Sequence, residues 1–141
     1  MILLDTNVIS EPLRAAPVAR VIRWLDAQPV ETLFLSVVTV AELRLGVARL
    51  PSGRRRKALL EQLERRLLPA FAGRILSFEL PAAERYAEAM AKALAAGRAV
   101  SVADGFIAGI ALAHGMAVAT RDTAPFEAMG VPVVDPWRDE G

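Results

Sequence analysis

Short apolar runs alternate along the chain with stretches in which apolar residues recur at helical spacing. The runs predict five buried strands, and amphipathic helices are predicted between them. This alternation favours an open α/β fold with a mostly parallel sheet. In such folds, ligands bind outside the carboxyl ends of the strands. The predicted strands cover residues 2–4, 32–36, 75–78, 117–120 and 131–134.

The stretch from Ser101 to Gly115 predicts a helix that is apolar on every side, which is typical of a buried helix. Apart from His114 in its last turn, its only ionisable residue is Asp104. An unpaired carboxylate is costly to bury, so proteins neutralise it, pair it or give it a metal ion. Because the helix supplies no cation of its own, the partner of Asp104 must come from elsewhere in the fold or from solution.

Three more acidic residues occupy comparable places. Asp5 ends the first predicted strand and Asp122 follows the fourth, while Glu42 is predicted in the first turn of the helix after the second strand. The carboxyl ends of parallel strands lie along one edge of a sheet, so we expect these acids to meet there. The helix of Asp104 must start at the same edge, because it runs away from that edge before the fourth strand returns.

Helix capping is the alternative interpretation for each acid. Thr39-x-x-Glu42 and Ser101-x-x-Asp104 both fit a capping box, and Asp5 is suited to an N-cap or a turn, as is the acid at position 122. Capping alone does not require apolar strands that end in acids, nor a buried helix without other charge. Taken together, the four acids therefore favour a functional site.

Convergent carboxylates have an electrostatic consequence. Two of them about 4 Å apart repel by about 4 kcal/mol at an effective dielectric constant near 20, which raises their pKa or recruits a cation. The chain has no cysteine and a single histidine, so the ligands are oxygens, which select Mg²⁺ or Mn²⁺ rather than Zn²⁺. Such ions serve phosphoryl and phosphodiester chemistry.

Composition narrows the class of protein. The 141 residues are 54% hydrophobic and 23% charged, which predicts one folded domain over residues 1–141. The net charge of +1 does not indicate a nucleic-acid partner, so any attraction to phosphate must come from a local basic patch. The absence of cysteine fits a reducing compartment. With neither a signal peptide nor an apolar run of membrane-spanning length, we expect a soluble cytoplasmic protein without membrane contact.

Four segments resemble the PIN-domain toxins of the VapC and FitB type, and they occur in that family's order. They are MILLDTNVISE at 1–11, SVVTVAELRLG at 36–46, VADGFIA at 102–108 and ATRDT at 119–123. The resemblance covers the chain from residue 1 to residue 137. It implies a five-stranded parallel sheet with helices on both sides, forming a single PIN-like nuclease domain.

The same resemblance implies a function and partners. It implies a Mg²⁺-dependent endoribonuclease that acts as the toxin of a type II toxin–antitoxin system, with Mn²⁺ as a substitute ion. It also implies homodimers, higher assemblies with a VapB- or FitA-like antitoxin, and contact with operator DNA only through that antitoxin. RNA would be cut to leave a 5′-phosphate and a 3′-hydroxyl.

The resemblance also implies which residues of this chain form the site, position by position. The acidic quartet corresponds to Asp5, Glu42, Asp104 and Asp122, with Asp5 and Asp104 as the principal metal ligands. Polar residues beside the family's site correspond to Asn7 and Thr120, which implies supporting roles for both.

Other residues have two interpretations each. A basic run, formed by Arg54, Arg55, Arg56 and Lys57, would either contact the RNA backbone or form a solvated loop between helices. Tyr86, Met90 and Leu94 are predicted in the core. Part of that stripe, with the apolar helix after Glu42, would alternatively form a groove for an antitoxin helix. Trp137 is predicted to be a packing anchor rather than a base-stacking platform.

Three competing functions remain open at this point. A phosphatase with an aspartyl nucleophile also begins with a strand that ends in aspartate, but it needs a second acid where Asn7 stands. A structure-specific DNA nuclease would use the same metal chemistry, but the chain lacks insertions for a large clamp. A catalytically silent subunit that acts as co-repressor with a DNA-binding partner is the third, and the intact acids count against it.

Overall fold

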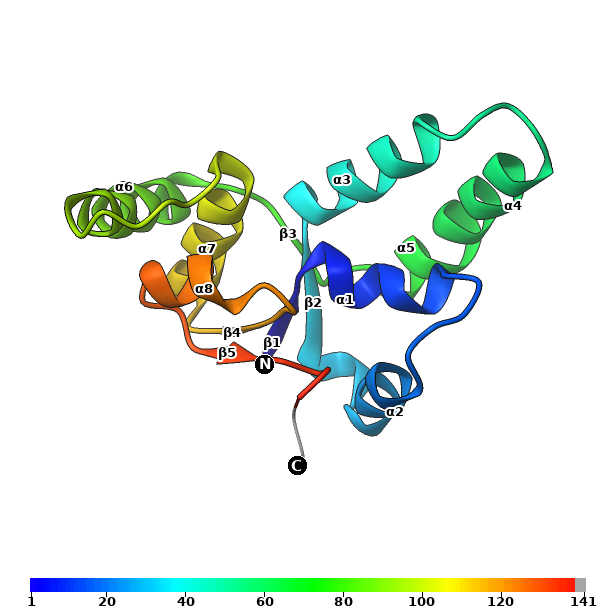
Figure 1. Cartoon of the computed structure of the whole chain (residues 1–141), viewed down its shortest axis with the longest axis horizontal. Helices are drawn as coiled ribbons and strands as arrows, with labels where there is room; N and C mark the ends of the chain where they lie inside the picture. The colour runs from blue at the N-terminus through cyan, green and yellow to red at the C-terminus, as the bar shows by residue number, and fades with distance from the viewer. Residues whose placement is uncertain (139–141) are drawn as a thin grey trace.

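The five predicted strands form one parallel sheet. The computed structural model describes residues 1–138, and residues 139–141 of the predicted polar tail lie outside that range. The strand order is β3-β2-β1-β4-β5, with β1 in the centre, which confirms the predicted fold class (Figure 1). All pairs are parallel, and Leu3 faces Phe34 on one side and Val118 on the other. The strands are β1 (Ile2–Leu4), β2 (Leu33–Ser36), β3 (Ile75–Leu76), β4 (Ala117–Ala119) and β5 (Val133–Val134).

The last strand is shorter than predicted for a local reason. Gly130, at a φ of +76°, ends the preceding helix, and the Val131 N–H is used by a hydrogen bond to the carbonyl of Phe126. Pro132 has no N–H to donate. Regular pairing therefore begins at Val133 rather than at residue 131.

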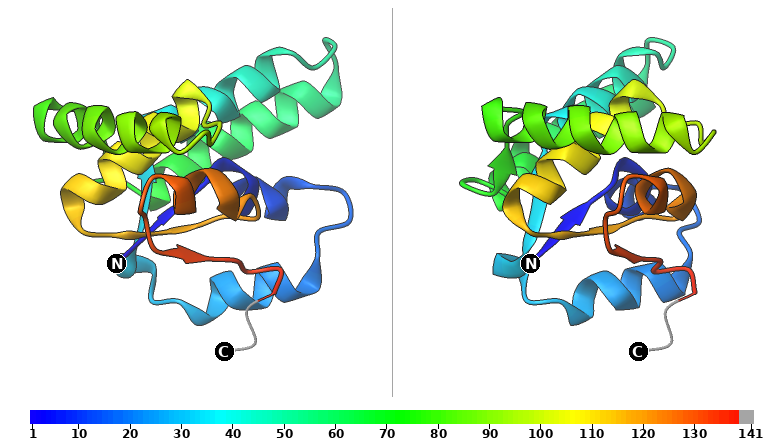
Figure 2. Two further views of the ribbon diagram at one scale, coloured as in Figure 1. Left: turned by 60° about the vertical axis from the view of Figure 1, so that its left-hand side comes forward. Right: turned by 90° about the vertical axis from the view of Figure 1, so that its left-hand side faces the viewer.

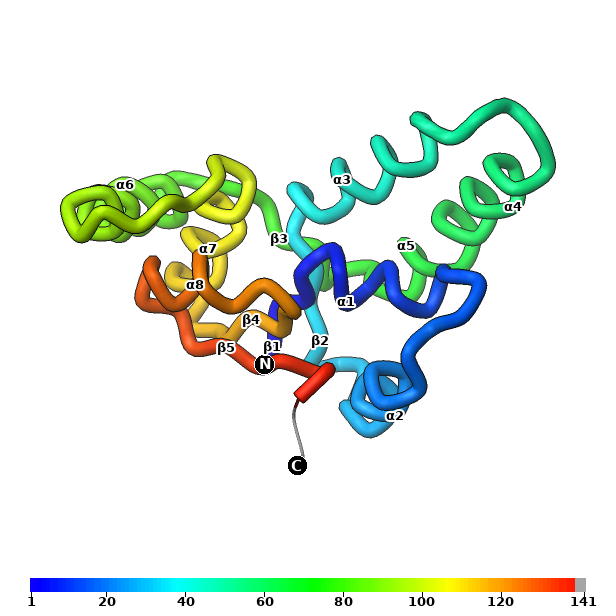
Figure 3. Tube along the Cα trace, viewed as in Figure 1, coloured from blue at the N-terminus to red at the C-terminus, as the bar shows by residue number. Residues whose placement is uncertain are grey.

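Helices occupy the connections between strands, as Figures 1 and 3 show. Short 3₁₀ turns, η1 (Glu11–Leu13) and η2 (Val30–Thr32), and a π-helical segment, η3 (Leu63–Leu67), add to them. Within residues 1–138, none of the helices is both long and apolar enough to cross a membrane. The α-helices are α1 (Thr6–Ser10), α2 (Ala19–Ala27), α3 (Val37–Ala48), α4 (Arg54–Gln62), α5 (Leu68–Ala70), α6 (Leu80–Ala95), α7 (Val102–His114) and α8 (Thr123–Ala128).

Two hydrophobic cores lie on opposite faces of the sheet. Because side chains alternate along a strand, Leu3 enters one core and Leu4 the other. The first core includes α6, α7 and α8, and the second includes residues of α1, α2 and α3 (Figures 1 and 2). This arrangement covers both faces of the sheet and leaves its edge at the carboxyl ends of the strands for polar residues.

Helix α7 packs closely on α6 through two glycines. A Cβ atom at Gly109 would lie 2.7 Å from the carbonyl oxygen of Ala82, and one at Gly105 would lie 2.7 Å from side-chain atoms of Tyr86 and Met90. The glycines lie four residues apart and therefore share a helix face. This contact fixes the beginning of α7, which carries Asp104.

Two predictions about these helices are corrected. Helix α7 is buried at Gly105 and from Ile107 to Ala111, but its first turn reaches the surface, where Val102 is 59% exposed. Leu94 is 62% exposed rather than in the core. The buried face of α6 includes Met90 and Ala93, and a side chain one position further along a helix points about 100° away.

Candidate active site

Asp5 is a buried carboxylate at the carboxyl end of the central strand. It is 5% exposed and is the N-cap of α1, so its Oδ1 accepts a hydrogen bond of 2.8 Å from the Thr6 N–H. Its Oδ2 accepts a second bond, also of 2.8 Å, from the hydroxyl of Thr120. Burial raises the pKa of Asp5 from 3.8 to about 6. The hydrogen bonds from Thr120 and Thr6 lower the pKa, while the charges of Asp104 and Glu42 raise it further.

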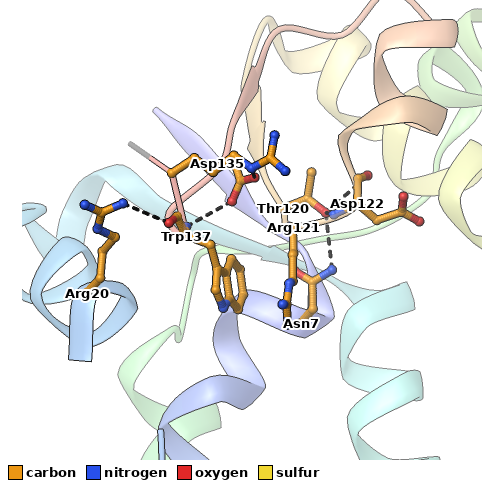
Figure 4. A network of polar contacts seen from close by, with 8 residues as sticks. Asn7, Arg20, Thr120, Arg121, Asp122, Asp135 and Trp137 are labelled. Carbon is orange, nitrogen blue, oxygen red and sulfur yellow. Dashed lines mark hydrogen bonds and ion pairs between the residues drawn. The ribbon is translucent and has the colours of Figure 1, made fainter. Parts of the chain in front are cut away.

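Thr120 and Asn7 surround this carboxylate, and both were predicted beside the site. Thr120 follows β4, which pairs with β1 and so brings residues 115 positions apart into contact. The Asn7 amide nitrogen lies 3.4 Å from Asp5 Oδ2 and 3.3 Å from Thr120 Oγ1. Its amide oxygen accepts a bond of 3.2 Å from the Arg121 N–H (Figure 4). Asn7 therefore ties the end of β4 to the start of α1.

Glu42 reaches the site from α3 through Thr6. The Thr6 hydroxyl donates a 2.7 Å hydrogen bond to Glu42 Oε1 and lies 3.4 Å from Thr39 Oγ1. Glu42 itself is exposed, so its carboxylate borders the site from the solvent side. Thr6 was not predicted as a site residue, although its position between Asp5 and Asn7 was a signal for it.

The predicted capping box at Thr39 is wrong. Ser36 is the N-cap of α3, and its Oγ accepts a bond of 3.1 Å from the Thr39 N–H. Because Ser36 directly ends β2, the helix begins at Val37 and Glu42 falls in the second turn rather than the first. The Thr39 side chain is fully buried beside Ser36 and is not a cap.

Asp104 lies in the first turn of α7, half-buried. The Ser101 side chain caps this helix, accepting a bond of 3.1 Å from the Asp104 N–H, which confirms the predicted N-cap. Burial raises the pKa of the Asp104 carboxyl; a hydrogen bond with the Ser101 side chain lowers it, and the charges of Asp122 and Glu42 raise it. Capping and electrostatic coupling therefore act on this residue together.

Asp122 occupies the N-cap position of α8, but its side chain makes no capping hydrogen bond. The residue is exposed, and its N–H donates a bond of 3.1 Å to Thr120 Oγ1 (Figure 4). The charge of Asp122 raises the pKa of the Asp104 carboxyl. Charge interactions thus link Asp104 with Asp5, Glu42 and Asp122, and they link Asp5 with Glu42. Asp5 is buried and Asp104 half-buried, while Glu42 and Asp122 lie at the rim.

The acidic charge has no protein counter-ion in the described part of the chain. The ion pairs found between residues 1 and 138 involve other acids, namely Glu11, Glu61, Glu64 and Asp135. Over the same residues, no three histidine, cysteine or acidic side chains are close enough together to enclose a metal ion. An all-oxygen donor set of uncompensated carboxylates fits a hard cation that retains several of its waters, as Mg²⁺ does.

The basic run lies apart from this acidic centre. Arg54 to Lys57 form the first turn of α4, so the prediction of a loop between helices is wrong. Gly53 supplies the N-cap position, and no side chain caps the helix there. Of the four, Arg55 lines a groove that leads to the acids.

That groove runs between α1, α3 and α4, has a volume of about 330 Å³, and is mostly apolar. Thr6 and Glu42 form its end at the acidic centre. The remaining lining residues are Ser10, Leu13, Arg14, Leu43, Gly46, Val47, Leu50, Arg55 and Leu59.

Glu11 is a buried acid that sequence patterns did not single out. It is 2% exposed, its carboxylate pairs with Arg14 at 3.1 Å, and it accepts a hydrogen bond of 3.3 Å from the Val18 N–H. These contacts fix the segment between η1 and α2. The spacing of Glu11 and Arg14, three residues apart, was the available signal.

Comparison with known proteins agrees with this fold. The family model described as PIN domain matches residues 2–131. The chain therefore belongs to the PIN-domain family.

Similar proteins indicate to which group within the PIN-domain family the chain belongs. It is 61% identical over 137 residues to "Plasmid stability protein StbB" of Pseudomonas syringae, covering 97% of this chain and 99% of that protein. It is 54% identical over 137 residues to "VapC ribonuclease Y4jK" of Sinorhizobium fredii, covering 97% and 98%. The solved structure of FitAcB from Neisseria gonorrhoeae superposes with a TM-score of 0.96 at 52% identity, covering 99% and 100%. FitAB bound to an IR36 DNA fragment matches with the same score and identity, covering 100% and 99%. Within the PIN family, the chain belongs with the VapC and FitB proteins.

Proposed function

We propose that this protein is a Mg²⁺-dependent endoribonuclease and the toxin of a type II toxin–antitoxin system. The observation that carries the proposal is Asp5, a buried carboxylate with a pKa raised to about 6. The charges of Asp104 and Glu42 act on it, Asp122 in turn acts on Asp104, and no ion pair to any of the four is found in residues 1–138. The likeness to a protein named as a VapC ribonuclease supports the choice of RNA as substrate.

Each acid has a role that follows from its place. Asp5 and Asp104 would hold Mg²⁺, or Mn²⁺ in its stead, because their carboxyls are the two whose pKa is raised by burial. When bound, the ion lowers the pKa of a water ligand and neutralises charge on the phosphate oxygens. Glu42 and Asp122 are exposed at the rim, where one of them orients the attacking water and accepts its proton.

The supporting residues hold the acids in place. Thr120 and the Thr6 N–H fix both oxygens of Asp5, and the Thr6 hydroxyl fixes one oxygen of Glu42. Attack of water on the phosphodiester breaks the bond to the 3′-oxygen, so the products carry a 5′-phosphate and a 3′-hydroxyl.

An antitoxin is the partner that this function requires. The groove between α1, α3 and α4 is mostly apolar and ends at Thr6 and Glu42, so an amphipathic antitoxin segment would fill it and place a cation on the acids. The match to the toxin chain of FitAB bound to DNA supports a FitA- or VapB-like antitoxin that carries the contact with operator DNA. Homodimers and larger assemblies with the antitoxin belong to the same proposal.

Cleavage of labelled single-stranded RNA tests the proposal. We expect the purified chain to cut RNA with Mg²⁺, to be inactive with EDTA, and to be inactive as Asp5→Asn while remaining folded. Cleavage at wild-type rates by Asp5→Asn would refute the assignment of that residue. No cleavage under any condition, with tight operator binding alongside an antitoxin, would instead support the silent co-repressor.

A further inference from the structure

A tryptophan from the C-terminal segment lies beside the acidic site. The backbone N–H of Trp137 donates a hydrogen bond of 2.9 Å to Asp135 Oδ1, and the backbone carbonyl of Trp137 accepts one of 3.0 Å from the Arg20 side chain in α2 (Figure 4). Its ring packs against the second hydrophobic core, which confirms the prediction of a packing anchor. The hydrogen bonds therefore hold the backbone of Trp137, and the core packs against its ring.

Arg121 joins this tryptophan to the site. Its guanidinium carbon lies 5.3 Å from the centre of the Trp137 ring, in cation–π geometry. Its N–H is bonded to Asn7 Oδ1, and Asn7 in turn contacts Asp5. Arg121 also lies between Thr120 and Asp122 in the sequence, so its backbone is part of the site while its side chain turns to the tryptophan.

Within residues 1–138, stacking on Trp137 leaves the N–H donors of the Arg121 guanidinium available to a ligand. Stacking uses the face of the planar group, whereas its five N–H donors point outward in the plane and match phosphate oxygens. Among the described residues, the Arg121 side chain makes no ion pair with the acids beside it, and the residue is exposed. Trp137 holds this cation in one place, which reduces the entropy lost when a ligand binds.

An acidic centre that cleaves RNA needs such a cation. Four carboxylates repel the phosphate backbone, and affinity for nucleic acid depends on basic side chains that contact phosphates. The net charge of +1 supplies no general attraction, so the contacts must be local. Of the basic run at the start of α4, Arg55 lines the groove, whereas Arg121 is next to Asp122 in the chain.

We propose that Arg121, stacked on Trp137, contacts a backbone phosphate of single-stranded RNA beside the phosphodiester that is cut. This inference rests on the proposed ribonuclease function. Arg121 is a substrate-binding residue in this assignment, and Trp137 is a positioning residue that acts through it. The Trp137 Nε1 is buried without a hydrogen-bond partner in the described range, so a phenylalanine here loses no hydrogen bond.

RNA binding without cleavage is the measurement that tests it. In an Asp5→Asn background with Mg²⁺, fluorescence anisotropy with a labelled 12-nucleotide RNA gives the Kd at several salt concentrations. We expect Arg121→Gln to weaken binding about tenfold at low salt and to reduce the salt slope by about 0.7, the loss of one phosphate contact on a single strand. Trp137→Phe should shift both quantities less, because phenylalanine retains a weaker cation–π contact.

Arg85→Gln is the matched control, since Arg85 is exposed on α6 and should leave both quantities unchanged. Equal Kd and slope for Arg121→Gln and its parent would overturn the inference, as would an equal loss in the control. An effect on antitoxin inhibition alone, with RNA binding unchanged, also overturns it. If Arg121→Gln weakens binding but the unmodified chain never cuts RNA, the proposed function fails and the RNA contact stands. If the Asp5→Asn parent does not bind RNA, both the proposed function and the proposed RNA contact are refuted.

Discussion

The Thr6 hydroxyl donates a hydrogen bond of 2.7 Å to Glu42 Oε1, and the N–H of the same residue is bonded to Asp5 Oδ1. One residue thus sets the spacing between a buried acid on β1 and an exposed acid on α3. Without this bond, Glu42 would be a solvent-exposed side chain with its usual rotamer freedom.

Replacing Thr6 by valine removes the hydroxyl and keeps the shape. We expect RNA cleavage to fall roughly tenfold to a hundredfold through kcat, because Glu42 is no longer positioned. Thr6→Ser retains the hydroxyl and should stay within a few-fold of wild type. Steady-state kinetics of both variants check this, with thermal unfolding to show that each is folded. Equal activity of the valine and serine variants would contradict the positioning role.

Asp5 makes the stability of the metal-free protein depend on pH. Its pKa is about 6 in the folded state against 3.8 normally, so the folded state binds the proton more tightly. The resulting stabilisation is fully present below pH 3.8 and is lost as the pH rises through about 6. Between pH 5 and pH 7.5 this group lowers the free energy of unfolding by about 1.4 kcal/mol, roughly half of its full effect.

Urea unfolding in EDTA measures that dependence. Asp5→Asn should be more stable than wild type at pH 7.5 and should lose most of the pH dependence between pH 5 and 7.5. A wild-type protein whose unfolding free energy increases over that range, in parallel with Asp5→Asn, would show that Asp5 ionises normally.

Divalent ions should stabilise the folded protein at neutral pH. A cation relieves the repulsion between Asp5 and Asp104, and a ligand at a hundred times its Kd adds about 2.7 kcal/mol to the free energy of unfolding. We expect Mg²⁺ and Mn²⁺ to raise the Tm at pH 7.5, and Asp104→Asn to abolish most of the shift. An equal shift in the double variant Asp5→Asn, Asp104→Asn would place the ion elsewhere.

The contact between α6 and α7 can be tested at its glycines. A Cβ at Gly109 meets the carbonyl oxygen of Ala82 at 2.7 Å, and a backbone atom cannot easily move away. Gly109→Ala should therefore destabilise the protein by about 1–3 kcal/mol. Gly46→Ala in α3 is the control, because a Cβ there has no atom within 4 Å. It should stabilise by about 0.5–1 kcal/mol, and both changes are read by urea unfolding.

The fold and much of the acidic site could be predicted from the sequence, because the ends of the strands can be recognised in it. Apolar runs that stop at Asp5 and Thr120 located two neighbouring strands and, with them, the edge where the polar residues meet. The contacts of Arg121 with Trp137 could not be predicted, because no sequence pattern says where the chain goes after its last strand. The start of α3 was misplaced because Ser36 and Thr39 both suit an N-cap, although the predicted strand ended correctly at residue 36; the helix begins directly after that strand, at Val37.

The placement of β1 at the centre of the sheet affects how the protein is made. Asp5 is synthesised before its hydrogen-bond partner Thr120, which follows 115 residues later. Until β4 has emerged and paired with β1, this part of the centre is incomplete. A growing polypeptide that has not reached β4 therefore lacks the complete acidic centre, and an antitoxin has until β4 is synthesised to be present.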